Sequence, residues 1–135
     1  MTALRTTVLA LLLTLATGVG AAVDPAFDFT GHWTGAGMED DKPQQAVTAD
    51  LVTQAGTRAF TGTATIADDP PLTCAVTGHQ KRHLMKVKIL LACGVGNLRL
   101  HATLDAAAQT LSGGYRRRGR HQVHVGTFTL TRQAS

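Results

Sequence analysis

Four arginines near the C-terminus form the densest group of side chains that could bind a charged ligand. Arg116, Arg117, Arg118 and Arg120 occur together in the stretch RRRGRH. A guanidinium group offers paired N–H donors that match the oxygens of carboxylate, phosphate or sulfate. The alternative is a solvated basic turn that only aids solubility. The arginines are therefore a candidate contact for an anion or a partner, with the solvated turn left open.

The six histidines do not form a catalytic or metal-binding pattern. His121 and His124 are three residues apart, so on a strand their side chains point to opposite faces and cannot share one metal without a bulge. His79 and His83 flank a turn. The chain also lacks a Gly-x-Ser-x-Gly motif, a phosphate-binding glycine loop and a paired-cysteine zinc motif. We predict a protein that is not an enzyme, with no catalytic residue, no metal and no cofactor.

The N-terminal residues predict export. Arg5 is followed by the apolar run VLALLLTLA and then by small residues through Ala22. This pattern is typical of a secretory signal peptide, and its apolar core is too short to span a bilayer. We therefore interpret residues 1–22 as a signal peptide cleaved after Ala21 or Ala22, and residues 23–135 as one domain. The expected location is the periplasm or the extracellular medium, without stable membrane insertion.

The two cysteines, Cys74 and Cys93, lie in the predicted exported part. In an oxidising compartment an even pair is expected to form a disulfide, and two buried thiols are the alternative. Charge is unevenly divided along the same part of the chain. Residues 23–69 hold two basic and eight acidic residues, whereas residues 70–135 hold ten basic residues and one acidic residue. One domain can fold these halves together or present them as separate faces, and neither arrangement requires a nucleic-acid partner.

Apolar residues recur with period two, which indicates strands. In LRLHATL, the residues Leu98, Leu100, Ala102 and Leu104 alternate with polar ones. Helical periodicity is absent after residue 22, and turn residues recur at short intervals. The predicted strands are 27–35, 46–54, 58–66, 73–80, 84–92, 96–104, 110–117 and 122–131. Short connections favour a single all-β, eight-stranded, antiparallel up-and-down barrel, and a flattened sandwich of the same strands is the alternative.

Gly31 and Trp33 in GHW on the first strand, with Arg132 at the end of the last strand, resemble the pattern of the calycin superfamily. That superfamily includes lipocalins, avidins and small bacterial metalloprotease inhibitors. The resemblance implies a barrel in which Trp33 plugs one end and Arg132 stacks on it. An arginine over a tryptophan face is a favourable cation–π contact. The Lys81–Arg82–His83 run is expected at the plugged end, away from the C-terminal arginines.

Two kinds of binding protein fit this barrel. The first holds a small apolar or amphipathic ligand between the strands. The candidate lining residues are Leu51, Phe60, Ile66, Val87, Ile89, Leu98 and Leu100. The second is a protein-interaction module, such as an inhibitor of a secreted protease or hydrolase, which the resemblance to the metalloprotease inhibitors implies. Those inhibitors act through a segment before the barrel, and here only residues 23–26 precede the first predicted strand.

Overall fold

The protein is an eight-stranded barrel, seen in a computed structural model that describes residues 25–40, 42–68, 70–83, 85–94, 96–118 and 121–134. The predicted signal peptide, with its cleavage site, lies outside these residues. The strands are β1 (Gly31–Glu39), β2 (Gln45–Thr53), β3 (Ala59–Ile66), β4 (Leu72–Gln80), β5 (Lys86–Ala92), β6 (Asn97–Asp105), β7 (Thr110–Arg118) and β8 (Val123–Arg132).

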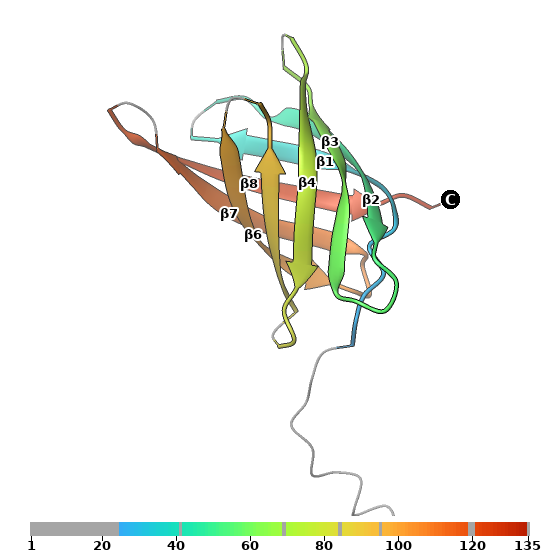
Figure 1. The fold of residues 1–135 in the computed structure, drawn as a ribbon. Coiled ribbons are helices and arrows are strands. Elements are labelled where there is room, and N and C mark those ends of the chain that lie inside the picture. The colour runs from blue at the N-terminus through green and yellow to red at the C-terminus, as the bar shows by residue number, and fades with distance from the viewer. Residues whose placement is uncertain are drawn as a thin grey trace, which may run out of the picture.

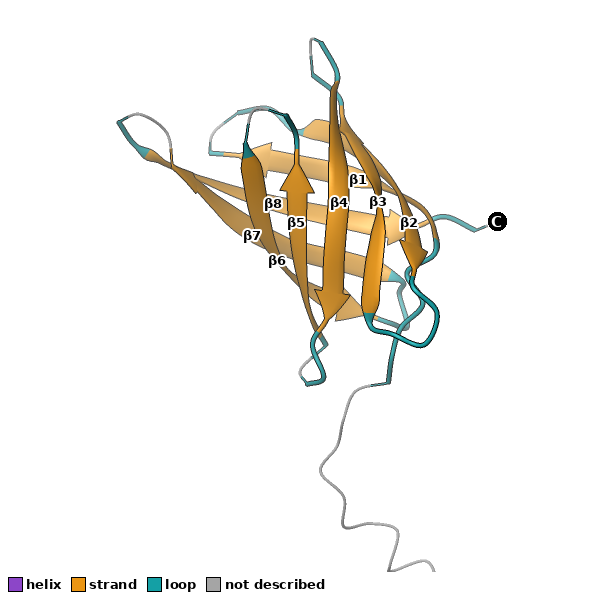
Figure 2. Ribbon diagram, viewed as in Figure 1, coloured by secondary structure: helices purple, strands orange, loops and turns teal. Residues whose placement is uncertain are grey.

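Each strand pairs antiparallel with the next, and β1 pairs with β8 to close the sheet (Figures 1 and 2). The closing pair runs from Trp33 opposite Arg132 to Glu39 opposite Gly126. The prediction of an up-and-down barrel is therefore confirmed, and the alternative of a flattened sandwich is wrong. Closure removes the free edges that an open sheet would expose.

The alternation of apolar and polar residues positions the core. On β6, Leu100, Ala102 and Leu104 are buried while the intervening His101 and Thr103 are exposed. Side chains on a strand point alternately to its two faces, so one set fills the barrel and the other covers its outer wall.

The first strand begins four residues later than predicted, at Gly31 instead of residue 27. The preceding segment, Phe27 to Thr30, lies at one end of the barrel. The Phe29 N–H donates to Thr53 Oγ1 (2.7 Å), and the Phe29 ring is fully buried with its centroid 4.4 Å from that of Phe60. The spacing of Phe27 and Phe29 matches that of a strand, but these rings contribute to the end of the core. We call residues 25–30 the closing segment.

Trp33 and Arg132 meet at this closed end. Trp33 is fully buried and its indole N–H donates to the Phe29 carbonyl (2.9 Å). The Arg132 guanidinium carbon lies 5.5 Å from the Trp33 ring centroid and 4.8 Å from that of Phe27. Gly31 adopts φ +143°, and a Cβ there would lie 3.0 Å from Arg132 Cδ. Glycine therefore suits both the backbone conformation and the close approach of the arginine.

A buried glutamine fastens the closing segment to the barrel. Gln80, at the end of β4, is 2 % exposed. Its side-chain oxygen accepts the Phe27 N–H (2.8 Å), and its side-chain nitrogen donates to the Pro25 carbonyl (2.9 Å). Buried polar groups are costly unless they are hydrogen-bonded, and these two bonds satisfy both ends of the amide.

The opposite end carries the predicted disulfide, which is confirmed. Cys74 and Cys93 are bonded, with their Cα atoms 4.1 Å apart and a sequence separation of 19 residues. Cys74 lies near the start of β4 and Cys93 directly after β5. The bridge joins two neighbouring strands at the open end, which we call the mouth.

Candidate ligand site in the barrel

The interior of the barrel contains a cavity of about 100 Å³ with an almost entirely apolar lining. Ala49 on β2 and Ala64 on β3 lie directly opposite each other, and both are buried. Both side chains point inward and are small, so they leave space that larger residues would fill. The cavity thus arises where the register places two alanines side by side.

Six of the seven predicted lining residues border this cavity. They are Leu51, Phe60, Ile66, Ile89, Leu98 and Leu100. Val87 does not border it. Val87 is buried, but it pairs with Gln80 beside the closing segment. It therefore belongs to the closed end of the core, below the cavity.

The cavity borders a wider hollow of about 830 Å³ at the mouth, where charged side chains lie beside apolar ones. Both spaces are lined by Glu39, Gln45, Ile66, Leu98 and Tyr115. The hollow adds Lys42, Cys93 and the arginines of β7. A molecule that fills both spaces would contact apolar side chains inside the barrel and charged side chains at the mouth.

An ion pair connects β1 to β7 at the mouth. Arg117 Nε and Nη2 donate to the two carboxylate oxygens of Glu39 (3.1 and 2.8 Å), and the Tyr115 hydroxyl donates to Glu39 Oε1 (3.3 Å). The hydrogen bonds from Arg117 hold the pKa of Glu39 below its usual value. Burial and the nearby Glu39 carboxylate raise the pKa of Tyr115. The Arg117–Glu39 ion pair therefore joins β1 to the β7–β8 hairpin at one side of the mouth.

A second contact, between Asp40 and His124, lies next to this ion pair. Asp40 adopts a left-handed conformation (φ 51°), and its Oδ2 lies 2.6 Å from His124 Nδ1 while its Oδ1 accepts the Val125 N–H (3.1 Å). These hydrogen bonds, led by the one from His124, lower the pKa of Asp40. Ligand atoms of Glu39, Asp40 and His124 lie within 4.8 Å of one another, which is close enough for a metal ion. However, Arg117 already donates to both Glu39 oxygens, and His124 and the Val125 N–H contact the two Asp40 oxygens, so these carboxylates are held by hydrogen bonds within the protein.

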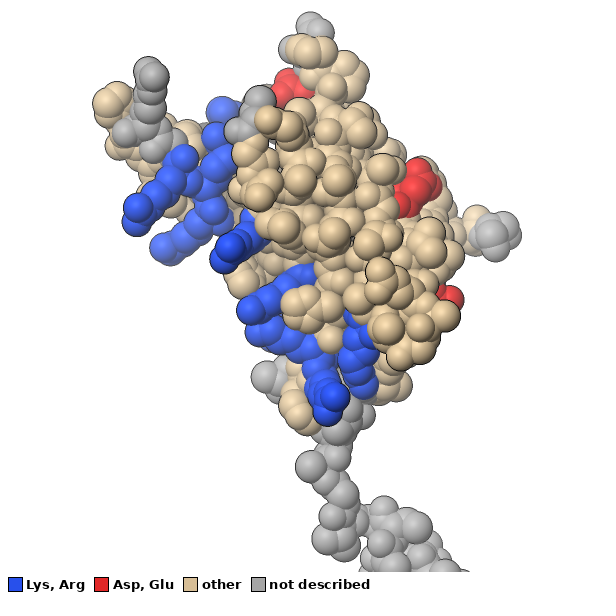
Figure 3. Space-filling view, viewed as in Figure 1, with Lys and Arg blue, Asp and Glu red and all other residues tan. Residues whose placement is uncertain are grey.

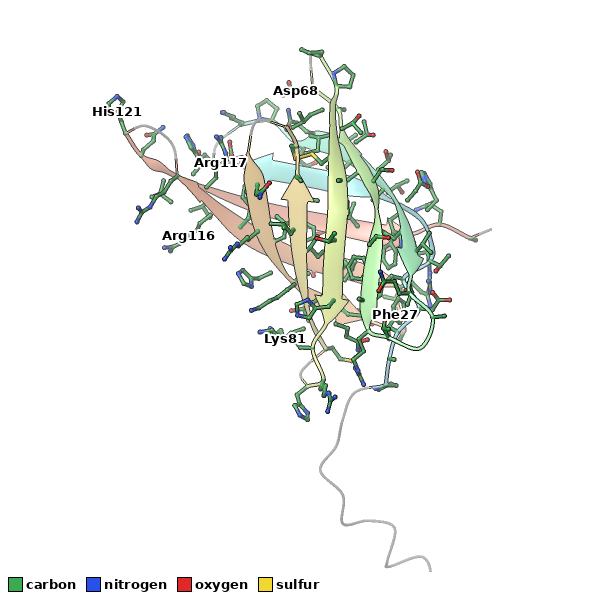
Figure 4. All side chains as sticks on the ribbon, in the orientation of Figure 1. Phe27, Asp68, Lys81, Arg116, Arg117 and His121 are labelled. Carbon is green, nitrogen blue, oxygen red and sulfur yellow. A yellow bond between two sulfur atoms is a disulfide. The ribbon has the colours of Figure 1, made fainter. Side chains whose placement is uncertain are left out.

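The predicted arginine group divides between two surfaces. All three arginines of β7 are exposed, but Arg117 pairs with Glu39 at the mouth, whereas Arg116 and Arg118 border the hollow without an ion pair. Figure 4 shows Arg116 and Arg117 on opposite sides of the hairpin. Consecutive residues of a strand point to opposite faces, which accounts for the division. Arg120 lies outside the described residues.

Comparison of the chain with protein-family models, with curated proteins and with solved structures found no match. Within the described residues, no helix has the length and apolar character needed to cross a membrane.

Proposed function

We propose that the protein is an exported, non-catalytic binding protein that holds a small apolar or amphipathic molecule inside its barrel. The observation that carries this proposal is the apolar cavity between the inward faces of the strands. Apolar cavities of this scale can take up small apolar molecules, and an engineered one of about 150 Å³ binds benzene. The disulfide supports export, because such bonds persist in oxidising compartments.

The shape of the site favours an amphipathic ligand. Pockets for drug-sized ligands typically measure about 300–1,000 Å³, so the inner cavity alone suits only a short chain or a small ring. The hollow at the mouth offers further space beside charged residues, including Lys42 and Arg117. The proposed ligand therefore places an apolar part among the core side chains and a polar part at the mouth.

The proposal can be tested with two probes that share an apolar chain, octanol and octyl sulfate. Binding to the disulfide-intact protein is measured by isothermal titration calorimetry. We expect both probes to bind, because both can bury the chain in the cavity, and octyl sulfate to bind more tightly if its head lies near the mouth cations. Burial of apolar surface should give a negative heat-capacity change.

An alanine substitution pair supplies the control. Ala64→Leu adds apolar volume inside the cavity, whereas Ala75→Leu adds the same side chain on β4 at an exposed position. We expect Ala64→Leu to abolish binding and Ala75→Leu to leave it unchanged. Equal affinity in both variants would place the probes on the surface and contradict the proposal. Absence of binding in the unsubstituted protein would move the search to a protein partner, such as a secreted hydrolase.

A further inference from the structure

The outer wall of the barrel carries a row of cations that the sequence does not place together. Lys86 and Lys88 lie on β5, Arg99 on β6, and Arg116 and Arg118 on β7. We call these five residues the cationic row. All five are exposed. Figure 3 shows Lys and Arg side chains forming a band on one face of the molecule, while the acidic side chains visible there lie at its edges.

The strand register aligns the row. Lys88 lies opposite His101, and Leu90 lies opposite Arg99. The β6–β7 register pairs Leu100 with Tyr115, so the next position toward the mouth brings Arg99 beside Arg116. Alternate residues of a strand are roughly 7 Å apart, so the row extends roughly 20 Å along the strand direction, from Lys86 to Arg118. Lys81, labelled in Figure 4, lies in the β4–β5 turn, and its N–H donates to the Lys86 carbonyl (2.7 Å). The row thus joins the two ends of the barrel.

Within the described part of the chain, none of the five cations of the row makes an ion pair. The ion pairs there involve Glu39, Asp40 and Asp50. Lys86 Nζ donates to Thr103 Oγ1 (3.3 Å), which is a neutral partner. Adjacent cations without counter-ions create a positive potential that attracts an anionic partner.

A surface depression lies beneath the middle of the row. It measures about 460 Å³ and is bordered by His79 on β4, Lys88 on β5, and Arg99 and His101 on β6. His79 and His101 flank Lys88 on the neighbouring strands. The depression thus places two histidines beside the middle cations of the row.

The aromatic residues distinguish between anionic polymers. The chain has six, and none lies on the outer wall: Trp33, Phe29, Phe60 and Phe128 are buried, while Phe27 and Tyr115 pack partly against the core. Proteins that bind single-stranded nucleic acid stack bases on exposed aromatic rings. Proteins anchored at a membrane interface use tryptophan and tyrosine there. The row offers neither.

We propose that the cationic row binds a linear anionic polysaccharide, one that carries sulfate or carboxylate groups along its chain. Lysine and arginine would neutralise successive anionic groups, and the two histidines beside Lys88 add hydrogen-bonding groups. None of the five cations lines the inner cavity, although Arg116 and Arg118 also border the hollow at the mouth. The proposal therefore does not depend on ligand binding inside the barrel.

The test measures binding of fluorescein-labelled heparin and alginate oligosaccharides by fluorescence anisotropy at low and at physiological salt. The test variant is Lys88→Gln/Arg99→Gln/Arg116→Gln. All three positions are exposed, and the unfolding midpoint checks that each variant folds. At roughly a fivefold loss for each cation near an anionic surface, the triple variant should lose affinity by about a hundredfold. Binding should also weaken as salt rises.

A matched pair of single variants separates position from net charge. Lys88→Gln and Lys42→Gln each remove one positive charge, the first from the row and the second from the mouth. We expect only Lys88→Gln to weaken binding. The proposal is overturned if neither glycan binds, or if Lys42→Gln weakens binding as much as Lys88→Gln. It is also overturned if an oligothymidylate or vesicles of phosphatidylcholine and phosphatidylglycerol bind more tightly than either glycan.

Discussion

Replacement of Phe29 by alanine tests how the barrel is closed. The Phe29 ring is fully buried and packs on Phe60 with centroids 4.4 Å apart. Truncating such a phenylalanine to alanine costs roughly 3–5 kcal/mol, because the loss of apolar burial and the remaining cavity both destabilise the fold. For a domain of this size, a loss of about 4 kcal/mol lowers Tm by roughly 15 °C.

Phe27→Ala is the matched control, because Phe27 lies in the same segment two residues earlier. The Phe27 side chain is half-buried and contacts Phe29 and Arg132 from one side. Its truncation should cost only roughly 1–2 kcal/mol. The backbone hydrogen bonds from the two positions, to Gln80 and Thr53, do not depend on the side chain that is removed.

Urea unfolding followed by fluorescence of the single tryptophan, Trp33, measures both variants. The probe lies at the closed end, so its signal reports the region under test. Equal losses of unfolding free energy in the two variants would refute the claim that Phe29 is the buried anchor of the closing segment. A loss below about 1 kcal/mol for Phe29→Ala would refute it as well.

Two further predictions concern the mouth. Removing the disulfide in Cys74→Ala/Cys93→Ala should lower the free energy of unfolding by about 3 kcal/mol, because the bond closes a loop of 19 residues in the unfolded chain. Urea unfolding of the oxidised wild type and of the variant measures this loss. Equal unfolding midpoints would contradict the prediction. Glu39→Gln should destabilise the protein by at most about 1 kcal/mol at pH 7. Arg117 lowers the pKa of Glu39 in the folded state, so the stability difference between wild type and variant should reach its full size above the ordinary pKa of 4.5. The difference should disappear as pH falls through the lower pKa of the folded state. A stability difference that persists unchanged at pH 2 would argue against the ion pair.

Much of the fold could be predicted from the sequence because the signal is local. Alternation of apolar and polar residues along β5 and β6 placed both strands to within about two residues. The predicted start of β1 was wrong because Phe27 and Phe29 are spaced like alternate residues of a strand, although both belong to the closing segment. Period two cannot distinguish a strand from an extended segment that buries alternate rings.

The candidate site was only partly predictable because it depends on register. Nothing local indicates that Ala49 lies opposite Ala64, yet that pairing leaves space in the core. Likewise, Lys88, Arg99 and Arg116 come from three strands and form one row only after the strands are aligned. The division of the arginines between mouth and outer wall could have been inferred, since strand alternation applies to charged residues as well.

The central claim, that the barrel holds a small molecule, is tested most directly by native mass spectrometry of the disulfide-intact protein purified from its own host. The account predicts a reproducible extra mass that dissociates on gentle activation and is absent from Ala64→Leu but present on Ala75→Leu. A bare protein mass in all three samples, together with no binding of octanol or octyl sulfate, would contradict it.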